Sequence, residues 1–165
     1  SFIELLGGIA KDELNDWYID SHRKCIVDCL ELKTDSISLL KTLKNMGVYT
    51  SVVSNIDQDM IEPLIARDQL HNYLNHWISS EKVKSCKPDQ KIFRHALELA
   101  NLSEKEVLFV GDSPEHDIAG ASRLGMITVL ITDGGMPPPL QSGVKKVTPD
   151  FTIKELSDIL GVIGS

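Results

Sequence analysis

The sequence predicts an α/β domain with a mostly parallel sheet and helices on both faces, preceded by a helical segment. From residue 48 onward, short apolar runs of strand length alternate with amphipathic helical patterns, which is typical of parallel sheets. Before residue 34, apolar residues recur at intervals of three and four, which indicates helix. The chain has 165 residues and is 42% hydrophobic. This suits one domain with a real core and excludes a largely disordered chain.

The individual elements follow from the same patterns. We expect residues 3–32 to be helical and a second helix to open at Asp35 and end at Gly47. The β-branched or apolar runs predict strands at residues 48–53, 77–79, 107–110 and 127–131. Further helices are expected at residues 57–67, 89–100, 115–124 and 153–160, and a Gly- and Pro-rich surface loop at 133–139. Because residues 107–110 (Val-Leu-Phe-Val) are all apolar, we expect that strand to be buried on both faces.

Composition narrows the range of partners. Lys and Arg number 17 against 24 Asp and Glu, a formal net charge of −7, so the clustered basic charge that nucleic acids require is lacking. No run approaches the roughly 18 apolar residues of a membrane span, and residues 1–10 lack the basic start of a signal peptide. The three cysteines (Cys25, Cys29 and Cys86) make neither a disulfide framework nor a zinc spacing. We therefore expect reduced thiols, a cytoplasmic location, and no nucleic acid or membrane as partner.

Polar side chains stand where predicted strands end, which is where open parallel sheets bind ligands. Ser54 and Asn55 directly follow one strand. Their hydroxyl, amide and turning backbone can hold the oxygens of an anion, or they merely cap the next helix. Lys87 precedes Pro88 at a helix start, where a cation is electrostatically unfavourable. The alternative for Lys87 is an ordinary solvated surface position.

Residues 111–117 (Gly-Asp-Ser-Pro-Glu-His-Asp) hold two carboxylates at a strand tip and in the helical turn that follows. Asp112 and Asp117 are hard oxygen ligands, and Mg²⁺ is typically bound by one or two carboxylates with phosphate and water. We expect Gly111 to permit the backbone turn. The alternative is that Asp112 or Ser113 simply caps the helix.

Together these segments resemble motifs II, III and IV of the haloacid dehalogenase (HAD) superfamily of hydrolases. The matching stretches are residues 52–55 (Val-Val-Ser-Asn), 86–89 (Cys-Lys-Pro-Asp) and 110–117, with the run 118–126 that follows. The resemblance covers about residues 39–160. It implies a HAD-like Rossmannoid core over residues 34–165 that lacks its first strand. Residues 1–33 would be the C-terminal part of a helical cap of the α-capped (subfamily I) type.

By motif, the resemblance implies a role for each site residue. Ser54 and Lys87 would be catalytic: Ser54 would hold a phosphoryl oxygen, helped by the amide region of Asn55, and Lys87 would neutralise charge. Asp112 would bind Mg²⁺ directly, while Asp117 would support the metal through water or orient Lys87. A phosphoryl transition state requires such positioning and countercharge. The implied activity is a Mg²⁺-dependent phosphatase that acts on a small phosphorylated metabolite through an aspartyl-phosphate.

The family's first motif, Asp-x-Asp-x-Thr/Val, carries the nucleophile and the general acid/base, and it is not found in this sequence. Asp28 ends an apolar run but lacks the second Asp, so we prefer a helical interpretation there. We therefore expect the chain to begin inside the cap and to be inactive alone. In the family the missing strand lies between those that carry motifs II and IV.

Two other functions stay open. The missing nucleophile favours a non-catalytic HAD-like binding or interaction module. A haloacid dehalogenase needs no metal, so paired Asp112 and Asp117 argue against it. For partners, the sequence leaves open a second copy of the chain or a missing N-terminal segment.

Overall fold

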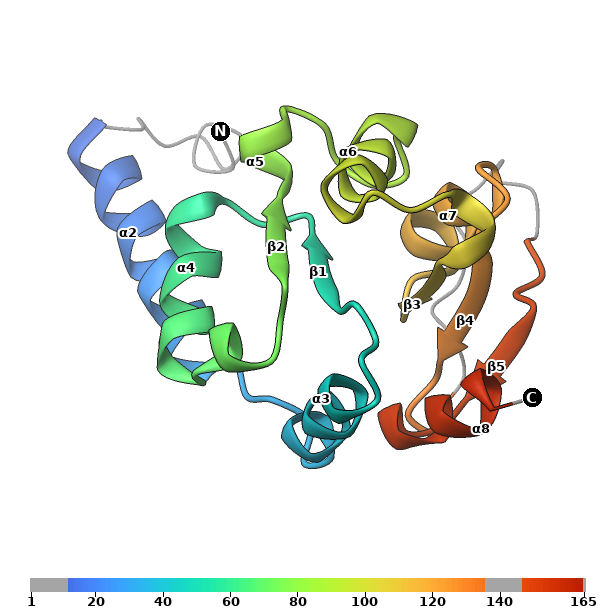
Figure 1. The fold of residues 1–165 in the computed structure, drawn as a ribbon. Helices are drawn as coiled ribbons and strands as arrows, with labels where there is room; N and C mark the ends of the chain where they lie inside the picture. Colours follow the sequence, from blue (N-terminus) through green and yellow to red (C-terminus); the bar gives the residue numbers. More distant parts are fainter. Residues whose placement is uncertain (1–11, 136–146, 165) are drawn as a thin grey trace.

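The computed structural model describes residues 12–135 and 147–164 (Figure 1). The strands are β1 (Ser51–Ser54), β2 (His76–Ser79), β3 (Leu108–Gly111), β4 (Ile127–Ile131) and β5 (Phe151–Ile153). The α-helices are α2 (Asp12–Cys29), α3 (Ser36–Asn45), α4 (Gln58–Arg67), α5 (Ser80–Val83), α6 (Gln90–Ala100), α7 (Ala119–Ser122) and α8 (Ile159–Ile163). Short helical turns lie at Leu70–Asn72, Glu104–Glu106, Pro114–Ile118 and Leu156–Asp158.

The strands form two parallel sheets, of order β1-β2 and β3-β4-β5. Ser54 pairs with Ser79 at the end of the first sheet, and Gly111 with Leu130 in the second. Among the described residues no strand pairing joins β1 to β3, although they are the facing edge strands of the two sheets (Figure 1). The interpretation that a strand of the family's core is missing between them stays a prediction.

Helices cover both faces, as the alternation of elements predicts. On one face α3 and α8 pack on β4 and β5 through a buried cluster of Leu39, Leu43, Val129, Ile131, Ile153 and Ile159. On the other face lie α5, α6 and α7, with buried Ile78, Val83, Ile92, Phe93, Ala121 and Met126. Successive side chains of β1 point to opposite faces of the sheet. Val52 packs against the buried residues of α4, and Val53 packs against those of α6.

Two helices span both sheets and so join them. In α3, Leu39 packs into the cluster of β4 and β5, whereas Leu40 packs into the cluster of α4, β1 and β2. The α6 cluster likewise takes Val53 from β1 and Phe109 from β3. Side-chain packing, rather than a continuous backbone ladder, therefore holds the two sheets together.

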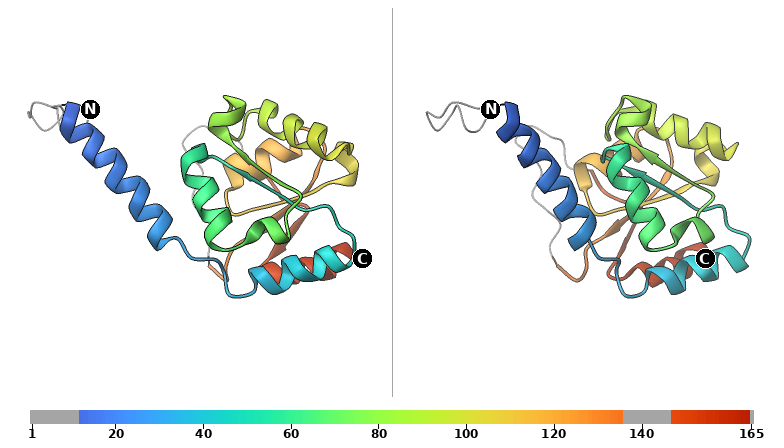
Figure 2. Two further views of the ribbon diagram at one scale, coloured as in Figure 1. Left: turned by 60° about the vertical axis from the view of Figure 1, so that its left-hand side comes forward. Right: turned by 90° about the vertical axis from the view of Figure 1, so that its left-hand side faces the viewer.

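Helix α2 extends from the rest of the molecule (Figure 2). Trp17 and Tyr18 are 63% and 62% exposed. The helix is attached to α4 by Arg23, whose guanidinium lies 3.1 Å from the carboxylates of both Asp57 and Asp59. The assignment of residues 1–33 to a cap stays a prediction, and residues 3–11 of the expected first helix lie outside the described residues.

Several helices and strands begin or end at other residues than predicted. The strand at 127–131 is confirmed in full, and α3 ends before Gly47, whose φ is +74°. The predicted strand at 48–53 is shorter and begins at Ser51. Strand β3 is half-buried throughout rather than fully buried, because in the described part of the chain it has a strand partner only on its β4 side. By contrast, four of the five residues of β4 are buried. The helix predicted at 115–124 is a π-helical turn followed by the short α7.

The helix predicted at 153–160 was wrong at its start. Residues 151–153 form β5, paired with β4 from Val129 to Ile131. Helical structure begins with the turn at Leu156–Asp158, which leads directly into α8 at Ile159. Asp150 explains the difference, because its carboxylate accepts hydrogen bonds from the backbone N–H (2.8 Å) and hydroxyl (2.7 Å) of Thr128. This contact brings the following residues alongside β4. The predicted 133–139 loop begins with a turn, and its residues 136–139 lie outside the described part.

Candidate active site

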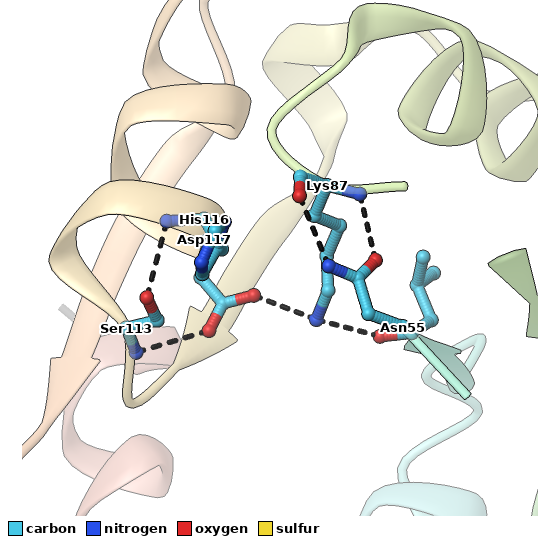
Figure 3. Close-up of polar contacts among 6 residues, drawn as sticks. Asn55, Lys87, Ser113, His116 and Asp117 are labelled. Carbon is cyan, nitrogen blue, oxygen red and sulfur yellow. Dashed lines mark hydrogen bonds and ion pairs between the residues drawn. The ribbon is translucent and has the colours of Figure 1, made fainter. Parts of the chain in front are cut away.

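Lys87 lies between the two sheets, near the carboxyl ends of β1 and β3 (Figure 3). Its Nζ donates a hydrogen bond to the Val53 carbonyl (2.9 Å) and lies 2.7 Å from Oδ1 of Asp117. The Lys87 side chain is only 14% exposed, and Nζ lies 5.8 Å from the centroid of the Phe109 ring. Lys87 is therefore no solvated surface lysine: it is a largely buried cation that links the end of β1 to the turn after β3.

Asn55 holds the backbone of Lys87. Its Nδ2 donates to the Lys87 carbonyl at 2.9 Å, and its Oδ1 accepts from the Lys87 N–H at 2.7 Å (Figure 3). The pair of bonds resembles one step of a strand ladder across 32 positions of sequence. Both polar atoms of the Asn55 side chain thus hold the Lys87 backbone in place. The expected contact of Asn55 with an anion would therefore be made by its backbone amide.

Asp117 has both carboxylate oxygens engaged. Oδ1 faces Lys87, and Oδ2 accepts a hydrogen bond of 3.0 Å from the Ser113 N–H. The Asp117 residue is 3% exposed, so the ion pair that it makes is largely removed from water. The hydroxyl of Ser113 accepts from the His116 N–H at 3.1 Å. Ser113 is therefore the residue that caps this turn, one of the two alternatives considered for it.

Gly111 is required by close approach rather than by a backbone turn. A Cβ placed on it would lie 2.4 Å from the Cβ, Cγ and Oδ2 atoms of Asp117. Its φ lies outside the left-handed region, so the expectation that this glycine permits the turn was wrong. The missing side chain lets the Asp117 carboxyl pack directly over the end of β3.

Asp112 and Ser54 differ from the residues around them. Asp112 is exposed, and its carboxylate makes no hydrogen bond or ion pair with any described residue. Ser54, the last residue of β1, is half-buried, and its hydroxyl has no side-chain partner in the described part of the chain. Both side chains are therefore available to a ligand at the ends of strands whose tips meet around Lys87.

The donor set is compatible with magnesium but small. The described residues contain no group of three or more His, Cys, Asp or Glu side chains that could hold a metal ion. Mg²⁺ needs only one or two protein carboxylates because water and phosphate supply the rest. Asp112 offers such a carboxylate, whereas the oxygens of Asp117 already have partners. The residues present therefore fit a Mg²⁺ held through Asp112.

Two buried polar atoms near the site were not anticipated from the sequence. Nδ1 of His116 and Oγ of Ser85 are buried without a hydrogen-bond partner among the described residues. Each lies within two positions of Asp117 or Lys87. The sequence carried no signal for their burial, because burial depends on contacts that form only in the folded chain.

A half-open hollow lies elsewhere in the described structure. A hollow of about 250 Å³ is lined by Lys44, Tyr49, His71 and Tyr73 among others. These residues precede β1 and β2, so the hollow is at the opposite end of the sheet from Ser54. The strand-end chemistry, and not cavity size, identifies the candidate site.

The chain belongs to the haloacid dehalogenase-like hydrolase family, whose sequence profile matches residues 3–131. It is 34% identical over 133 residues to a glyceraldehyde 3-phosphate phosphatase of Methanopyrus kandleri, covering 78% of this chain and 55% of the relative. It is 31% identical over 104 residues to (S)-2-haloacid dehalogenase 4A of Burkholderia cepacia, covering 63% of this chain and 45% of the relative. The chain thus spans about half the length of these curated relatives.

Solved structures agree on the fold. A HAD phosphatase from Thermococcus onnurineus superposes with a TM-score of 0.75 at 23% identity, covering 99% of this chain and 69% of that one. In the part of the chain that is described, no helix is long and apolar enough to cross a bilayer.

Proposed function

We propose that this chain belongs to a Mg²⁺-dependent phosphatase that hydrolyses a small phosphorylated metabolite. The observation that supports it best is the largely buried Lys87 ammonium, held between the end of β1 and Asp117. Ser54 at the end of β1 and Asp112 directly after β3 add a hydroxyl and a carboxylate that have no side-chain partner among the described residues. A cation, a hydroxyl and a metal-binding carboxylate at one edge form the countercharge that phosphoryl transfer requires.

Each residue would then have a distinct role. Ser54 would donate its hydroxyl to a phosphoryl oxygen, and Lys87 would place positive charge against the phosphoryl group. Asn55 and Asp117 would act as positioning residues, because their side chains contact Lys87 directly. Of the two roles considered for Asp117, its engaged oxygens favour orienting Lys87. Asp112 would hold Mg²⁺, which when bound neutralises charge on the phosphate.

Two alternatives remain to be separated from this proposal. The matching relatives include both a phosphatase and a haloacid dehalogenase, so sequence likeness alone does not choose. The free Asp112 carboxylate favours the metal-dependent reaction. A non-catalytic module would apply if no Asp-x-Asp motif accompanies this chain in its gene.

The decisive experiment begins with the reading frame upstream of Ser1. If it encodes Asp-x-Asp-x-Thr or its Val variant after an apolar run, the longer protein should be assayed on phosphate monoesters and on 2-haloacids, with Mg²⁺ and with a chelator. Phosphate release that chelation abolishes supports the proposal. Chelator-resistant halide release would establish the dehalogenase, and neither activity would establish the binding module.

The chain of 165 residues by itself should bind phosphate but should not hydrolyse a phosphate ester. Without a covalent nucleophile, its groups can orient a phosphate but cannot attack it. We expect no hydrolysis of p-nitrophenyl phosphate with Mg²⁺. Turnover above background that disappears in Asp28→Asn would overturn this expectation and assign the nucleophile to Asp28.

Ligand binding tests the site without turnover. Asp112→Asn should weaken Mg²⁺ binding, whereas Glu115→Gln, the same charge change in the same turn, should not. Lys87→Ala should weaken vanadate binding, whereas Lys91→Ala, an exposed lysine on α6, should not. Equal effects within either pair would remove Asp112 or Lys87 from the site.

A further inference from the structure

Two free cysteines lie together on the exposed side of α2. Cys25 and Cys29 are one helical turn apart, both are exposed, and their Sγ atoms are 3.8 Å apart. The third cysteine, Cys86, is also free and exposed but lies at the distant Lys87 segment. The pair plays no part in the candidate active site.

The helical turn that carries the pair is anchored to the body of the protein. Leu30 N–H donates to the Ile26 carbonyl at 2.9 Å, which continues the helical bonding past Cys29. The Arg67 guanidinium, from α4, donates to the Leu30 carbonyl at 2.6 Å and also to the Val27 carbonyl. Carbonyls at the end of α2 are thereby satisfied by a residue some 40 positions away, and the spacing of the two thiols is held by helix geometry.

This spacing does not suit a disulfide. A disulfide needs Cβ atoms about 3.5–4.5 Å apart and an S–S bond of about 2.05 Å. Cβ atoms one helical turn apart are about 5–6 Å from each other. Closing the bond would require α2 to unwind against the Arg67 contacts.

The spacing does suit a tetrahedral metal ion. Zinc–sulfur bonds of about 2.3 Å at a tetrahedral angle place two sulfurs roughly 3.8 Å apart, which matches the observed separation of the Sγ atoms. We propose that Cys25 and Cys29 form a two-thiolate site for a soft divalent cation, Zn²⁺ or Cd²⁺. Each thiol gives up its proton as its sulfur bonds to the metal, so no oxidant or reductant is needed. The described residues supply no cluster of three ligands, and water completes the coordination.

The test is titration of the reduced, full chain with Cd²⁺ alone, followed by the ultraviolet thiolate-to-cadmium absorption, with Zn²⁺ as competitor. Cys25→Ser and Cys29→Ser should each weaken binding roughly tenfold or more, since loss of even an outer-shell partner costs that much. Cys86→Ser, the matched exposed cysteine, should bind as the unaltered chain does. Unaltered binding in either Cys25→Ser or Cys29→Ser, or an equal loss in Cys86→Ser, would overturn the proposal.

A second variant tests the geometry. Lys24→Cys combined with Cys25→Ser keeps two exposed thiols but turns one of them about 100° around the helix. It should bind as weakly as Cys25→Ser, with circular dichroism showing that α2 is retained. Affinity equal to that of the unaltered chain would mean that any two thiols suffice, and would overturn the site. None of these readouts depends on phosphatase activity.

Discussion

At the scale of single residues, the candidate site depends on how Asp117 is packed. Gly111 leaves room for its carboxyl, Ser113 donates to one oxygen, and Lys87 faces the other. Neither charge of the ion pair has ready access to water, because the two side chains are 14% and 4% exposed. Removing either partner of such a pair leaves the other as an uncompensated charge, which destabilises the fold.

Gly111→Ala should destabilise the chain by about 1–3 kcal/mol, the usual cost of overpacking. The added Cβ would meet Asp117 at 2.4 Å and push its carboxyl off Lys87 and Ser113. Urea unfolding measures the change. Gly161→Ala is the matched control, because Gly161 lies in α8 with nothing within 4 Å of its Cβ position, and it should be neutral or stabilising. Equal stability of Gly111→Ala and the parent would refute the close-packing argument.

Lys87→Met should cost about 3 kcal/mol of unfolding free energy, since it leaves the Asp117 carboxylate buried without its counter-charge. Adding Asp117→Asn should recover much of this loss, because a neutral amide needs no cation. The measurement is a double-mutant cycle by urea unfolding. Simple additivity of the two single changes would show that the pair is not coupled.

At the scale of elements, short segments are placed by contacts with distant ones. Helix α7 packs against α6 through Gly120, where a Cβ would lie 2.5 Å from the Phe93 ring and 3.2 Å from Cα of Pro88. The same glycine thus sets α7 against the residue that follows Lys87. At the other edge of the sheet, Asp150 joins β5 to β4 through Thr128, which is 1% exposed.

Asp150→Asn should lower stability at neutral pH, with a difference that shrinks in acid. Hydrogen bonds from the Thr128 backbone, and then from its hydroxyl, hold the pKa of Asp150 below its usual value. A carboxylate with a lowered folded-state pKa stabilises the fold above the pKa of the unfolded chain, about 3.9. That contribution is lost as the pH falls through the folded value. Urea unfolding from pH 7 downward measures it, and a difference that does not vary with pH would contradict this account.

At the scale of the whole molecule, the two sheets lie edge to edge. Among the described residues, their neighbouring edge strands β1 and β3 do not pair with each other. Among the described strands, β4 has partners on both sides, whereas β1 and β3 each have one. Unmet backbone groups at such edges cost roughly 1–3 kcal/mol each where they are buried. The isolated chain should therefore lie at the low end of the range of about 5–15 kcal/mol for folded domains, or associate with itself.

Amide hydrogen exchange should reveal this asymmetry. We expect residues 127–131 to exchange more slowly than residues 51–54 and 108–111, because opening of an edge strand breaks fewer contacts. Sedimentation velocity over a range of concentrations accompanies the measurement. Equally slow exchange in all three strands of a monomer would show that the facing edges are satisfied in some other way.

The sequence by itself determined the alternation of strands and helices as far as β4, the family, and the residues that gather at the strand ends. These follow from local periodicity and from short motifs, which depend on neighbouring residues. Only the tertiary structure decided that Asn55 holds the Lys87 backbone, that Gly111 makes room for Asp117, and that residues 151–153 form a strand. Each of these rests on a contact between atoms that meet only after folding: Asn55 with Lys87 across 32 positions, and Thr128 with Asp150 across 22. Such contacts leave no periodic trace in the sequence, because either partner alone is compatible with several local conformations.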